Sequence, residues 1–446
     1  MCSATVVGPK VTTLPYIARP TYSDFAPLLP DTSGERWNGA AAAGTNTIVT
    51  YSFAGRATFP SGDGHDASFV AGYRSFTAAQ KQATRDVLSM IEDFSGLRFV
   101  EVGRGGMIDL QIVVPRDAGT NVTGFADLPF AYEGYRPLAS DVVMIDRDFA
   151  RPGTDGFLTL MHEVGHALGL HHTFGRHLQV PRANDFDENS VMTYTIDGSP
   201  AQTFGSFDKA ALRFLYGSSA SADELDVTLT SRGLVRTVGG GGDDAVHGAF
   251  GRNVMIGRGG EDTLFGNFRS DRLVGGGGGD DLHGLAGDDR IVGGKGLDRL
   301  WGGDGDDRLG GGAGRDWLSG EAGDDRLIGG GRNDQLFGGD GNDRLVGAAG
   351  ADRLAGGAGA DRLTGGTGAD VFVFTADDAG ARDVIQDFAT GADRIDLSAL
   401  ATGFDEVNVV RSDSDTGDAL VEVAGVTIEL RGTGDLTLTA EDFLFG

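Results

Sequence analysis

Residues 284–310 read GLAGDDRIV, GGKGLDRLW and GGDGDDRLG, three consecutive nine-residue units that share one pattern. The pattern runs without a frame slip from Gly239 to Val373, which makes fifteen units in 135 residues. Glycine opens every unit, position six is Asp in fourteen units and Asn253 in the other, and position eight is always apolar. Glycine fills 43 of these positions without a Gly-X-Y period, so a collagen helix is excluded. A flexible linker is also disfavoured, because linkers do not hold a register over such a length.

The consensus GGxGxDxUx is typical of parallel β-helices that bind Ca²⁺. Six residues form a turn in which glycines allow unusual φ angles and expose backbone carbonyls, and the Asp adds a carboxylate. The next three residues form a short strand whose apolar position eight points inward. Two units make one coil, so the repeats predict about seven coils and rows of shared oxygen-ligand sites. The predicted calcium ligands are the position-six aspartates, Asp244, Asp262, Asp271, Asp280, Asp289, Asp298, Asp307, Asp316, Asp325, Asp334, Asp343, Asp352, Asp361 and Asp370.

Calcium is expected to control the folding of this repeat region. Aligned carboxylates repel one another, so we predict a roll that is poorly folded at cytosolic calcium and folds at near-millimolar, extracellular calcium. Two units depart from the consensus: residues 248–256 lack the Asp, and residues 266–274 lack most of the glycines. An arginine recurs at position seven and is interpreted as a solvated, charge-balancing ladder, with a binding role as the alternative. Its members are Arg272, Arg290, Arg299, Arg308 and Arg326.

The composition of the whole chain excludes several classes of protein. The 446 residues include 65 Asp and Glu against 37 Lys and Arg, a net charge of -28, which argues against nucleic acid as a partner. The single cysteine, Cys2, excludes intrachain disulfides and a Cys-based zinc cluster and is interpreted as a spectator thiol. No apolar run approaches the ~20 residues of a membrane span, and no cleaved secretory signal is visible at the N-terminus.

Charge and composition also divide the chain into parts. Residues 1–218 have a net charge of -6 and residues 219–446 a net charge of -22. We predict a short propeptide or disordered arm at 1–22, a mixed α/β domain at 23–218, a connecting strand or linker at 219–238, the repeat roll at 239–373 and a C-terminal β region at 374–446. Within the α/β domain, strands are predicted at Asn46–Phe53, Leu97–Val102, Asp109–Val114 and Asp141–Asp146, one helix after a Thr77–Gln80 capping box, and another capped by Ser206 and ended by Gly217.

A histidine cluster in this domain predicts a metal site. The string HEVGHALGLHH at 162–172 places His162 and His166 four residues apart, on one face of a helix, where two imidazoles can share a zinc ion at ~2.0–2.1 Å. Gly169 allows the positive-φ residue that ends a helix, and the reversed chain can bring back His172 as a third ligand. Glu163 projects near the metal without ligating it and can accept a proton from zinc-bound water.

The string matches H-E-x-x-H-x-x-G-x-x-H, the signature of metzincin zinc proteases. Metzincins also have a methionine turn beneath the zinc, and SVMTY at 190–194 supplies Met192 for it. Tyr194 is placed to ligate the resting zinc or to donate a hydrogen bond to the oxyanion of the tetrahedral intermediate. His171 and His177 lie outside the motif's register and are interpreted as solvent or outer groups. The alternatives are a surface helix with ordinary histidines and an ordinary core methionine at Met192.

This combination resembles the serralysin family, the secreted RTX metzincin endopeptidases of Gram-negative bacteria. The resemblance runs from about Pro27 to the C-terminus and takes in the zinc helix, the SVMTY turn, DKAALRFLYG at 208–217, the repeats and DVIQDFATGADRIDLSAL at 383–400. It implies an α+β metzincin domain at 23–218, a twisted sheet plus the active-site helix, followed by an all-β, calcium-filled parallel β-roll. It also implies a type I secretion signal at the uncleaved C-terminus.

The resemblance implies roles for individual residues. His162, His166 and His172 would be the zinc ligands, Glu163 the general base, Met192 the residue beneath the metal and Tyr194 the transition-state tyrosine. The strand DVVMID at 141–146 falls where such enzymes have the edge strand that pairs with an extended substrate. Thr173 stands where the family usually has Pro, the loop at 174–189 differs from the expected pattern, and Gly446 is added to the usual acidic–hydrophobic ending.

The function implied is that of a secreted, extracellular zinc endopeptidase with one catalytic Zn²⁺ and several structural Ca²⁺ ions. Its partners would be protein or peptide substrates, the type I secretion machinery and a small protein inhibitor, with a monomer as the default. The alternative comes from another class, because RTX rolls occur on proteins of many activities. The chain would then be a calcium-dependent surface or binding protein with an inactive protease-like domain, and the presence of Glu163 beside the three histidines favours the enzyme.

Overall fold

The computed structural model describes residues 45–53, 70–103, 107–115, 124–126, 130–132, 136–138, 140–144, 154–170, 204, 206–216, 225–231, 234–249, 251–411, 418–431 and 438–446. Contacts divide the chain into two compact units, Met1–Gly233 and Leu234–Gly446. The predictions for Cys2, His171, His172, Thr173, His177, Met192 and Tyr194 lie outside the described residues. Among the described helices, none combines the length and the apolar character that crossing a membrane requires.

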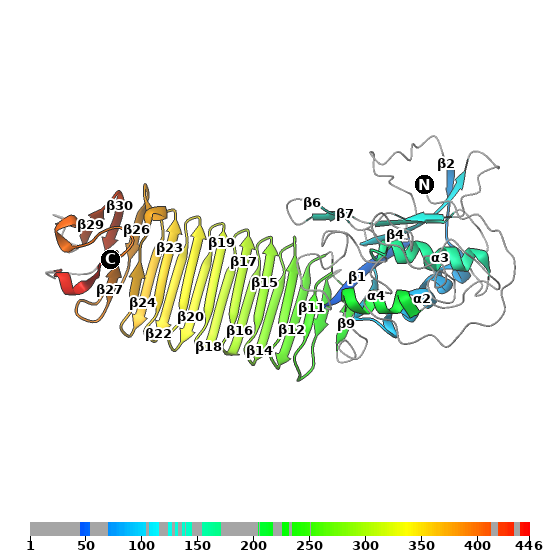
Figure 1. Ribbon diagram of the computed structural model, residues 1–446, viewed down its shortest axis with the longest axis horizontal. Helices are drawn as coiled ribbons and strands as arrows, with labels where there is room; N and C mark the ends of the chain where they lie inside the picture. Colours follow the sequence, from blue (N-terminus) through cyan, green and yellow to red (C-terminus); the bar gives the residue numbers. More distant parts are fainter. Residues whose placement is uncertain are drawn as a thin grey trace. The chain divides into compact units, whose positions relative to one another are not determined.

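The first unit is built on a mostly parallel sheet around β1 (Asn46–Phe53), whose predicted bounds are confirmed (Figure 1). Strand β1 pairs in parallel with β3 (Leu97–Glu101) and β4 (Ile108–Pro115), and β4 pairs in parallel with β8 (Ser140–Met144). Branched and aromatic side chains fill β1, and Ile48, Val49 and Tyr51 are buried. Further strands of the unit are β2 (Val70–Arg74), antiparallel on β4, the antiparallel pair β6 (Phe130–Tyr132) and β7 (Arg136–Leu138), and β9 (Asp226–Leu229).

The prediction that DVVMID forms the edge of this sheet is wrong. Strand β8 is flanked on both sides, by β4 and by β5 (Gly124–Ala126), which runs antiparallel to it. Within the described residues, β5 is the last strand of the order β1-β4-β8-β5. A strand of three residues that begins with glycine has too little alternation to be recognised in a sequence.

Helix α2 (Ala78–Glu92) begins at the predicted capping box, which is present in both directions. The Gln80 N–H donates to the Thr77 Oγ1 at 3.2 Å, and the Thr77 N–H donates to the Gln80 Oε1 at 3.0 Å. The buried face of α2 includes Ala83, Val87, Leu88 and Ile91, which recur at the helical spacing that the sequence predicts.

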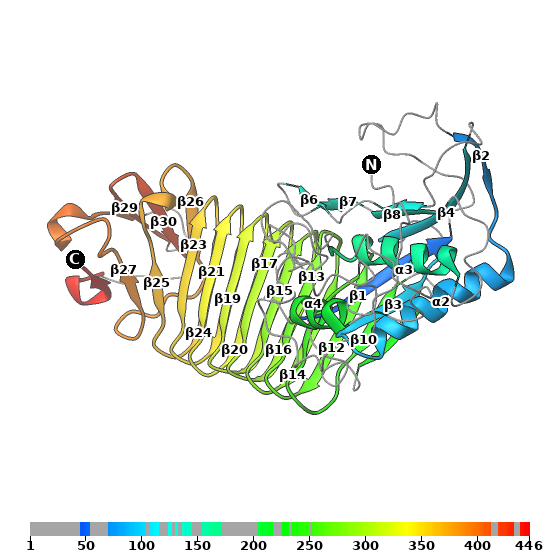
Figure 2. The same ribbon diagram turned by 45° about the vertical axis from the view of Figure 1, so that its right-hand side comes forward.

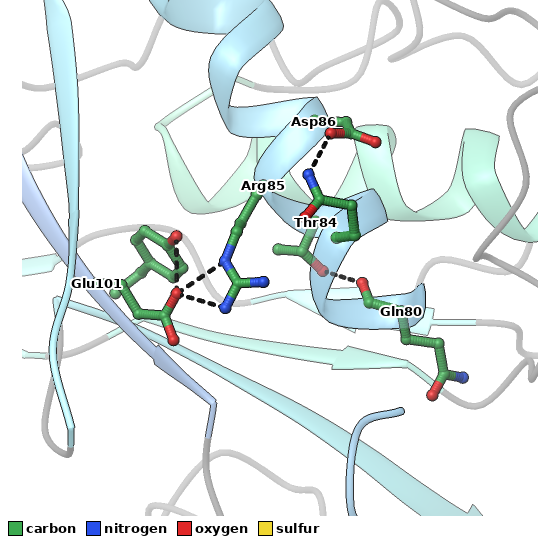
Figure 3. Close-up of polar contacts among 7 residues, drawn as sticks. Gln80, Thr84, Arg85, Asp86 and Glu101 are labelled. Atoms are coloured by element: carbon green, nitrogen blue, oxygen red, sulfur yellow. Dashed lines mark hydrogen bonds and ion pairs between the residues drawn. The ribbon is translucent and has the colours of Figure 1, made fainter. Parts of the chain in front are cut away.

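One ion pair ties the exposed side of α2 to the sheet. Arg85 on α2 contacts Glu101 of β3 through both Nε, at 2.9 Å, and Nη2, at 2.8 Å (Figure 3). The Tyr51 hydroxyl donates to the same Glu101 oxygen at 3.3 Å, and burial, with the Glu101 charge, raises the pKa of Tyr51 to about 12. The phenol therefore stays protonated and links β1 to the Glu101 carboxylate that Arg85 of α2 contacts.

The second unit is a roll of two parallel sheets, and the predicted coil of two repeat units is confirmed (Figure 2). Strands of odd number pair with one another and strands of even number do the same, each register advancing by eighteen residues, as in Leu282↔Leu300 and Leu309↔Leu327. Position eight points inward along the whole roll, and Leu300, for example, is 0% exposed. The core is therefore two facing rows of aliphatic side chains.

The strands of the repeat region begin before residue 239 and alternate between the two sheets. Their bounds are β10 (Val235–Val238), β11 (Ala245–His247), β12 (Asn253–Gly259), β13 (Thr263–Asn267), β14 (Arg272–Gly277), β15 (Asp281–Ala286), β16 (Arg290–Gly296), β17 (Arg299–Asp304), β18 (Arg308–Gly314), β19 (Trp317–Ala322), β20 (Arg326–Gly331), β21 (Gln335–Asp340), β22 (Arg344–Ala349), β23 (Arg353–Ala358), β24 (Arg362–Thr367) and β25 (Val371–Val373).

The C-terminal segment continues both sheets. One sheet runs on from β25 through β27 to β31, and the other from β24 through β26 and β30 to the antiparallel strands β29 and β28. The bounds of these elements are η5 (Ala376–Asp378), β26 (Arg382–Ile385), β27 (Arg394–Asp396), η6 (Phe404–Glu406), β28 (Asn408–Arg411), β29 (Ala419–Val423), β30 (Val426–Leu430), η7 (Ala440–Asp442) and β31 (Phe443–Leu444). The roll therefore extends past the last repeat unit.

Candidate metal centres

The position-six carboxylates of the roll form two hydrogen-bonded rows. From Asp262 onward, Oδ1 of each Asp accepts the backbone N–H of the position-six residue eighteen positions earlier. The Asp307 Oδ1 accepts the Asp289 N–H at 2.7 Å, and the Asp325 Oδ1 accepts the Asp307 N–H at 2.7 Å. Successive carboxylates of a row are therefore one strand spacing apart, ~4.8 Å.

The second oxygen of these carboxylates is buried beside a glycine. At twelve of the fourteen predicted aspartates Oδ2 has no hydrogen-bond partner among the described residues. An added Cβ on Gly302, the first residue of its unit, would overlap the Asp307 Oδ2 and lie 2.6 Å from the Gly320 carbonyl oxygen. Glycine at position one thus leaves a small space surrounded by carboxylate and carbonyl oxygens.

Burial disfavours the ionised form of these side chains. It raises the pKa of Asp307 and of Asp325 to about 7, and that of Asp289 to about 9, and neighbouring carboxylates, in the rows or in the adjoining turns, add to the effect. A divalent cation reverses this preference because it stabilises the charged carboxylate. An oxygen-only donor set of carboxylates and backbone carbonyls is the set that Ca²⁺ prefers.

In two of the predicted aspartates, Asp244 and Asp271, the Oδ2 atom already accepts a hydrogen bond. The Asp244 Oδ2 accepts the Gly240 N–H at 2.9 Å, at the start of the repeats. The Asp271 Oδ1 accepts from Asn253, and its Oδ2 accepts the Asn267 N–H at 2.9 Å. These two residues are accordingly weaker candidates for calcium ligands than the other twelve.

In the two units that depart from the consensus, the side-chain amides of Asn253 and Asn267 donate hydrogen bonds to the same turn. The Asn253 Nδ2 donates to the carbonyl oxygens of Ala249 at 2.9 Å and Gly251 at 3.0 Å. Asn267 donates through Nδ2 to the same two carbonyls. The turn therefore satisfies its carbonyls with neutral N–H donors where the regular units present a carboxylate and carbonyls only.

Sequence reasoning missed two aspartates that prolong the rows. The Asp383 Oδ1 accepts the Asp361 N–H at 3.0 Å, and the Asp393 Oδ1 accepts the Asp370 N–H at 3.0 Å. The Asp383 Oδ2 is buried without a partner among the described residues, like those of the repeats. Both aspartates keep the Asp-x-Ile half of the repeat, which is the signal that identifies them once the nine-residue spacing has ended.

The donor set explains why no compact metal cluster is seen in the roll. Within the part of the chain that the structure describes, no three His, Cys, Asp or Glu side chains gather as a group that could hold a metal ion. Each coil supplies one inward carboxylate per row, and the other oxygens belong to the backbone. The residues present therefore fit calcium, and the twelve Oδ2 atoms are the side-chain oxygens that the structure leaves available to it.

The second candidate centre is helix α3 (Asp155–Ala167), which carries the first part of the zinc motif. Thr154 caps its start by accepting the Phe157 N–H at 3.3 Å. At its end Gly169 has φ 89°, the Gly169 N–H donates to the His166 carbonyl at 2.8 Å, and the Leu170 N–H donates to the Gly165 carbonyl at 3.0 Å. This is the Schellman pattern, and it confirms that Gly169 ends the helix with a positive φ.

The two helix histidines lie together on one face. The rings of His162 and His166 meet edge to face with centroids 4.8 Å apart. The His166 Nδ1 lies 2.7 Å from the Leu170 carbonyl, which can only accept, so Nδ1 carries the proton and Nε2 the lone pair. Glu163, between them in sequence, is 4% exposed. The helix thus presents two nitrogen donors and one buried carboxylate.

Helix α4 (Ser206–Tyr216) supports this end of α3. The buried Tyr216 hydroxyl donates to the Leu168 carbonyl at 2.9 Å, next to the turn that orients His166. The predicted helix is confirmed, but Ser206 is its first helical residue rather than its cap. The predicted partners of the site, His172, Met192 and Tyr194, are outside the described residues.

Comparison with known proteins identifies the repeats and confirms the prediction of a calcium-binding roll. The family model of the RTX calcium-binding nonapeptide repeat (4 copies) matches residues 238–273, 265–300, 274–309, 283–318, 301–336, 319–354 and 337–372. Serralysin from Proteus mirabilis is 27% identical over 221 residues, which cover 42% of this chain and 43% of that protein. Serralysin G from Dickeya chrysanthemi is 28% identical over 204 residues, 42% of either protein. The match thus spans less than half the length of these relatives.

Two solved structures show a limited likeness to parts of this chain. A subunit of the Azotobacter vinelandii mannuronan C5-epimerase is 34% identical, over 28% of this chain and 81% of that chain, with a TM-score of 0.25. The extracellular lipase LipA from Serratia marcescens is 17% identical, over 46% of this chain and 45% of that chain, with a TM-score of 0.20.

Proposed function

We propose that this protein is a secreted zinc-dependent endopeptidase whose catalytic unit precedes a calcium-filled roll. The observation that carries the proposal is the arrangement on α3, where His162 and His166 share a face and His166 is oriented through Nδ1. Paired histidines fixed in this way are characteristic of a catalytic zinc site. The weak similarity to serralysins covers the C-terminal 42% of the chain, so it supports a relationship through the roll and does not bear on α3.

His162, His166 and His172 would hold the zinc ion, and Met192 would lie beneath it. Zinc supplies Lewis acidity and lowers the pKa of a bound water towards ~7. Glu163, which is buried on α3, would accept a proton from the attacking water and pass it to the leaving amine. Tyr194 would donate a hydrogen bond to the developing oxyanion.

An extended peptide would bind along β5. Helix α3 contacts both β5 and β8, and β5 has no second partner strand among the described residues. An exposed strand edge offers a row of N–H and C=O groups that pairs with an extended segment irrespective of its side chains. This placement brings a substrate backbone beside the helix that carries the histidines.

The roll would link activity to export. The predicted sequence of events is passage through a type I secretion machinery as an unfolded chain, followed by folding in extracellular calcium. A small protein inhibitor and a monomeric state complete the proposal, as the resemblance to serralysins implies.

Substitution of Glu163 by Gln tests the enzyme assignment. Glu163→Gln should keep the zinc content of the wild type and lower casein cleavage in millimolar calcium by roughly 10²–10⁴-fold, because the general base is lost while the ligands stay. The matched control is Glu101→Gln, an exposed carboxylate paired with Arg85, which should cleave at the wild-type rate. Cleavage should also stop with 1,10-phenanthroline and return with zinc. Wild-type turnover by Glu163→Gln would show that the assignment is wrong.

The second candidate is a calcium-dependent surface or binding protein with an inactive protease-like domain. The specific observation that favours it is that the RTX repeats are the part of the chain matched by a family model. A purified chain that folds in calcium but holds no zinc and cleaves no protein would establish this alternative.

A further inference from the structure

Six arginines lie side by side on the outer face of one sheet of the roll. The register pairs them directly on neighbouring parallel strands, from β14 to β24. At a strand spacing of ~4.8 Å the row is about 24 Å long. All six are exposed at position seven, and we call them the arginine row: Arg272, Arg290, Arg308, Arg326, Arg344 and Arg362.

The six strands that carry the arginine row have no negative side chain of their own, and the exposed carboxylates of Asp288, Asp306 and Asp324 lie in the turns, two residues before Arg290, Arg308 and Arg326. Strands β14, β16, β18, β20, β22 and β24 contain the six arginines and Lys295 but no Asp or Glu. Among the residues that the structure describes, none of the six forms an ion pair. The opposite sheet differs, because Asp281, Asp304, Glu321 and Asp340 lie on its strands. A half of the chain with net charge -22 thus carries a basic face on these six strands, and carboxylates are confined to the turns beside it.

An aliphatic row runs alongside the arginines. Position nine of the same strands carries Val274, Val292, Gly310, Ile328, Val346 and Thr364, each half-buried and paired in register. The small Gly310 between Val292 and Ile328 leaves a groove of about 360 Å³, which Arg290, Arg308 and Arg326 also line. The face therefore combines a line of cations with an apolar strip and a shallow groove.

Stability of the roll does not account for the arginine row. Like charges directly opposite one another on neighbouring strands are destabilising, so six in register weaken the sheet. The outer face of the other sheet shows what a stabilising ladder looks like. There the ring centroids lie 4.6 Å apart for Phe265 and His283 and 4.1 Å apart for His283 and Trp301, and the rings are stacked.

We propose that this face binds a linear carboxylated polysaccharide along the arginine row. Guanidinium groups pair with carboxylates in a planar, two-pronged geometry, and the C–H faces of sugar rings pack on aliphatic side chains. A polyuronate carries one carboxylate per ring, and in an extended two-fold chain the carboxylates of one face recur every two rings, which is about twice the strand spacing of ~4.8 Å and matches every second arginine.

Other polyanions match the arginine row less well. In an extended acidic peptide, side chains on one face recur only every ~6.6–6.8 Å, because each residue rises 3.3–3.4 Å. Duplex DNA presents phosphates at ~3.4 Å per strand on a curved surface, and the acidic remainder of the roll would repel its high charge density. The spacing and the flat apolar strip therefore favour a polysaccharide. The proposal does not depend on the zinc site.

The test measures binding of a fluorescent oligogalacturonate to the full-length protein in calcium. The triple variant Arg290→Gln/Arg308→Gln/Arg326→Gln removes the groove's three cations and should weaken binding about tenfold or more. The matched control Arg269→Gln/Arg315→Gln/Arg394→Gln removes three exposed arginines outside the row and should stay within about twofold of the wild type. Circular dichroism in calcium verifies that both variants fold.

A second variant, Arg290→Lys/Arg308→Lys/Arg326→Lys, keeps the charge and loses the planar fork, so an intermediate loss is expected. Absence of binding by the wild type, or equal losses in the glutamine and control variants, would overturn the proposal. The choice of a polysaccharide would be overturned if single-stranded DNA or poly-glutamate displaced the probe as effectively as unlabelled oligogalacturonate does. Neutral dextran should not compete.

Discussion

Substitution of Asp307 by Asn should have opposite effects on the roll with and without calcium. Asn is nearly isosteric, and its Oδ1 can still accept the Asp289 N–H that Asp307 accepts at 2.7 Å. Its Nδ2 takes the place of the buried Oδ2 and can donate to nearby carbonyls, as Asn253 does in the degenerate turn. The variant therefore removes a calcium ligand and leaves the hydrogen-bonded row intact.

The size of the effect follows from the pKa of Asp307. Burial raises it from an ordinary 3.8 to about 7. A difference of about three pKa units corresponds to roughly 4 kcal/mol, an upper bound on what ionisation of this side chain costs the roll without calcium. Because the folded pKa is the higher one, this cost grows as the pH rises above 3.8 and is complete above about 7. At pH 8 without calcium, Asp307→Asn should thus stabilise the roll, by up to that amount.

The assay compares thermal unfolding of the full chain, followed by circular dichroism, in chelator and in millimolar calcium. Asp307→Asn should raise the strand signal or the melting temperature in chelator, lower the melting temperature in calcium, and reduce the amount of calcium bound. Asp304→Asn is the matched control, since Asp304 lies in the same unit at an exposed position and should leave all three unchanged. A variant that is destabilised in chelator and binds as much calcium as the wild type would refute the reasoning.

Three further outcomes are expected. In chelator, acidification from about pH 8 to about pH 5 should increase the strand signal measured by circular dichroism. Carboxylates whose pKa is raised in the folded roll, such as that of Asp289, bind protons more readily when folded, so protonation favours folding. A weaker strand signal at about pH 5 would contradict this. Asn253→Asp should destabilise the roll in chelator by about 1–3 kcal/mol, since it removes the donor to the Ala249 carbonyl and buries a charge, and calcium should restore most of the loss in denaturant titrations. Leu309→Ala should cost about 2–5 kcal/mol in calcium because Leu309 is buried at position eight, whereas the outward Val292→Ala should cost much less in the same titrations.

The repeat region could be predicted closely because each consensus position makes a defined contact in the folded roll. Gly302 is required because a Cβ at this position would overlap the Asp307 carboxylate. Leu309 is required because its side chain fills the core. The rule fails where the chain changes its spacing. The bonds from Asp361 to Asp383 and from Asp370 to Asp393 span 22 and 23 residues in place of eighteen, so insertions hide two members of the rows from a nine-residue search.

The first unit was harder to predict because tertiary pairing decides its sheet order. The bounds of β1 and the capping box at Thr77 follow from local preferences and were predictable. The position of β8 inside the sheet depends on β5, whose three residues carry no periodic signal. The prediction that His162 and His166 share a helix face was correct, because two residues four positions apart on a helix lie on the same face whatever surrounds them.

Calcium and the basic face of the roll are coupled by the alternation of a strand. Position six turns its carboxylate inward, and position seven, the next residue, turns its side chain to the opposite face. The arginine row exists only when successive coils stack in register, and the inward carboxylates oppose that stacking until a cation neutralises them. Calcium bound to the inward carboxylates would therefore align the six guanidinium groups without contacting any of them. A binding surface assembled in this way would be latent inside a cell and formed outside it, on the same signal that folds the roll.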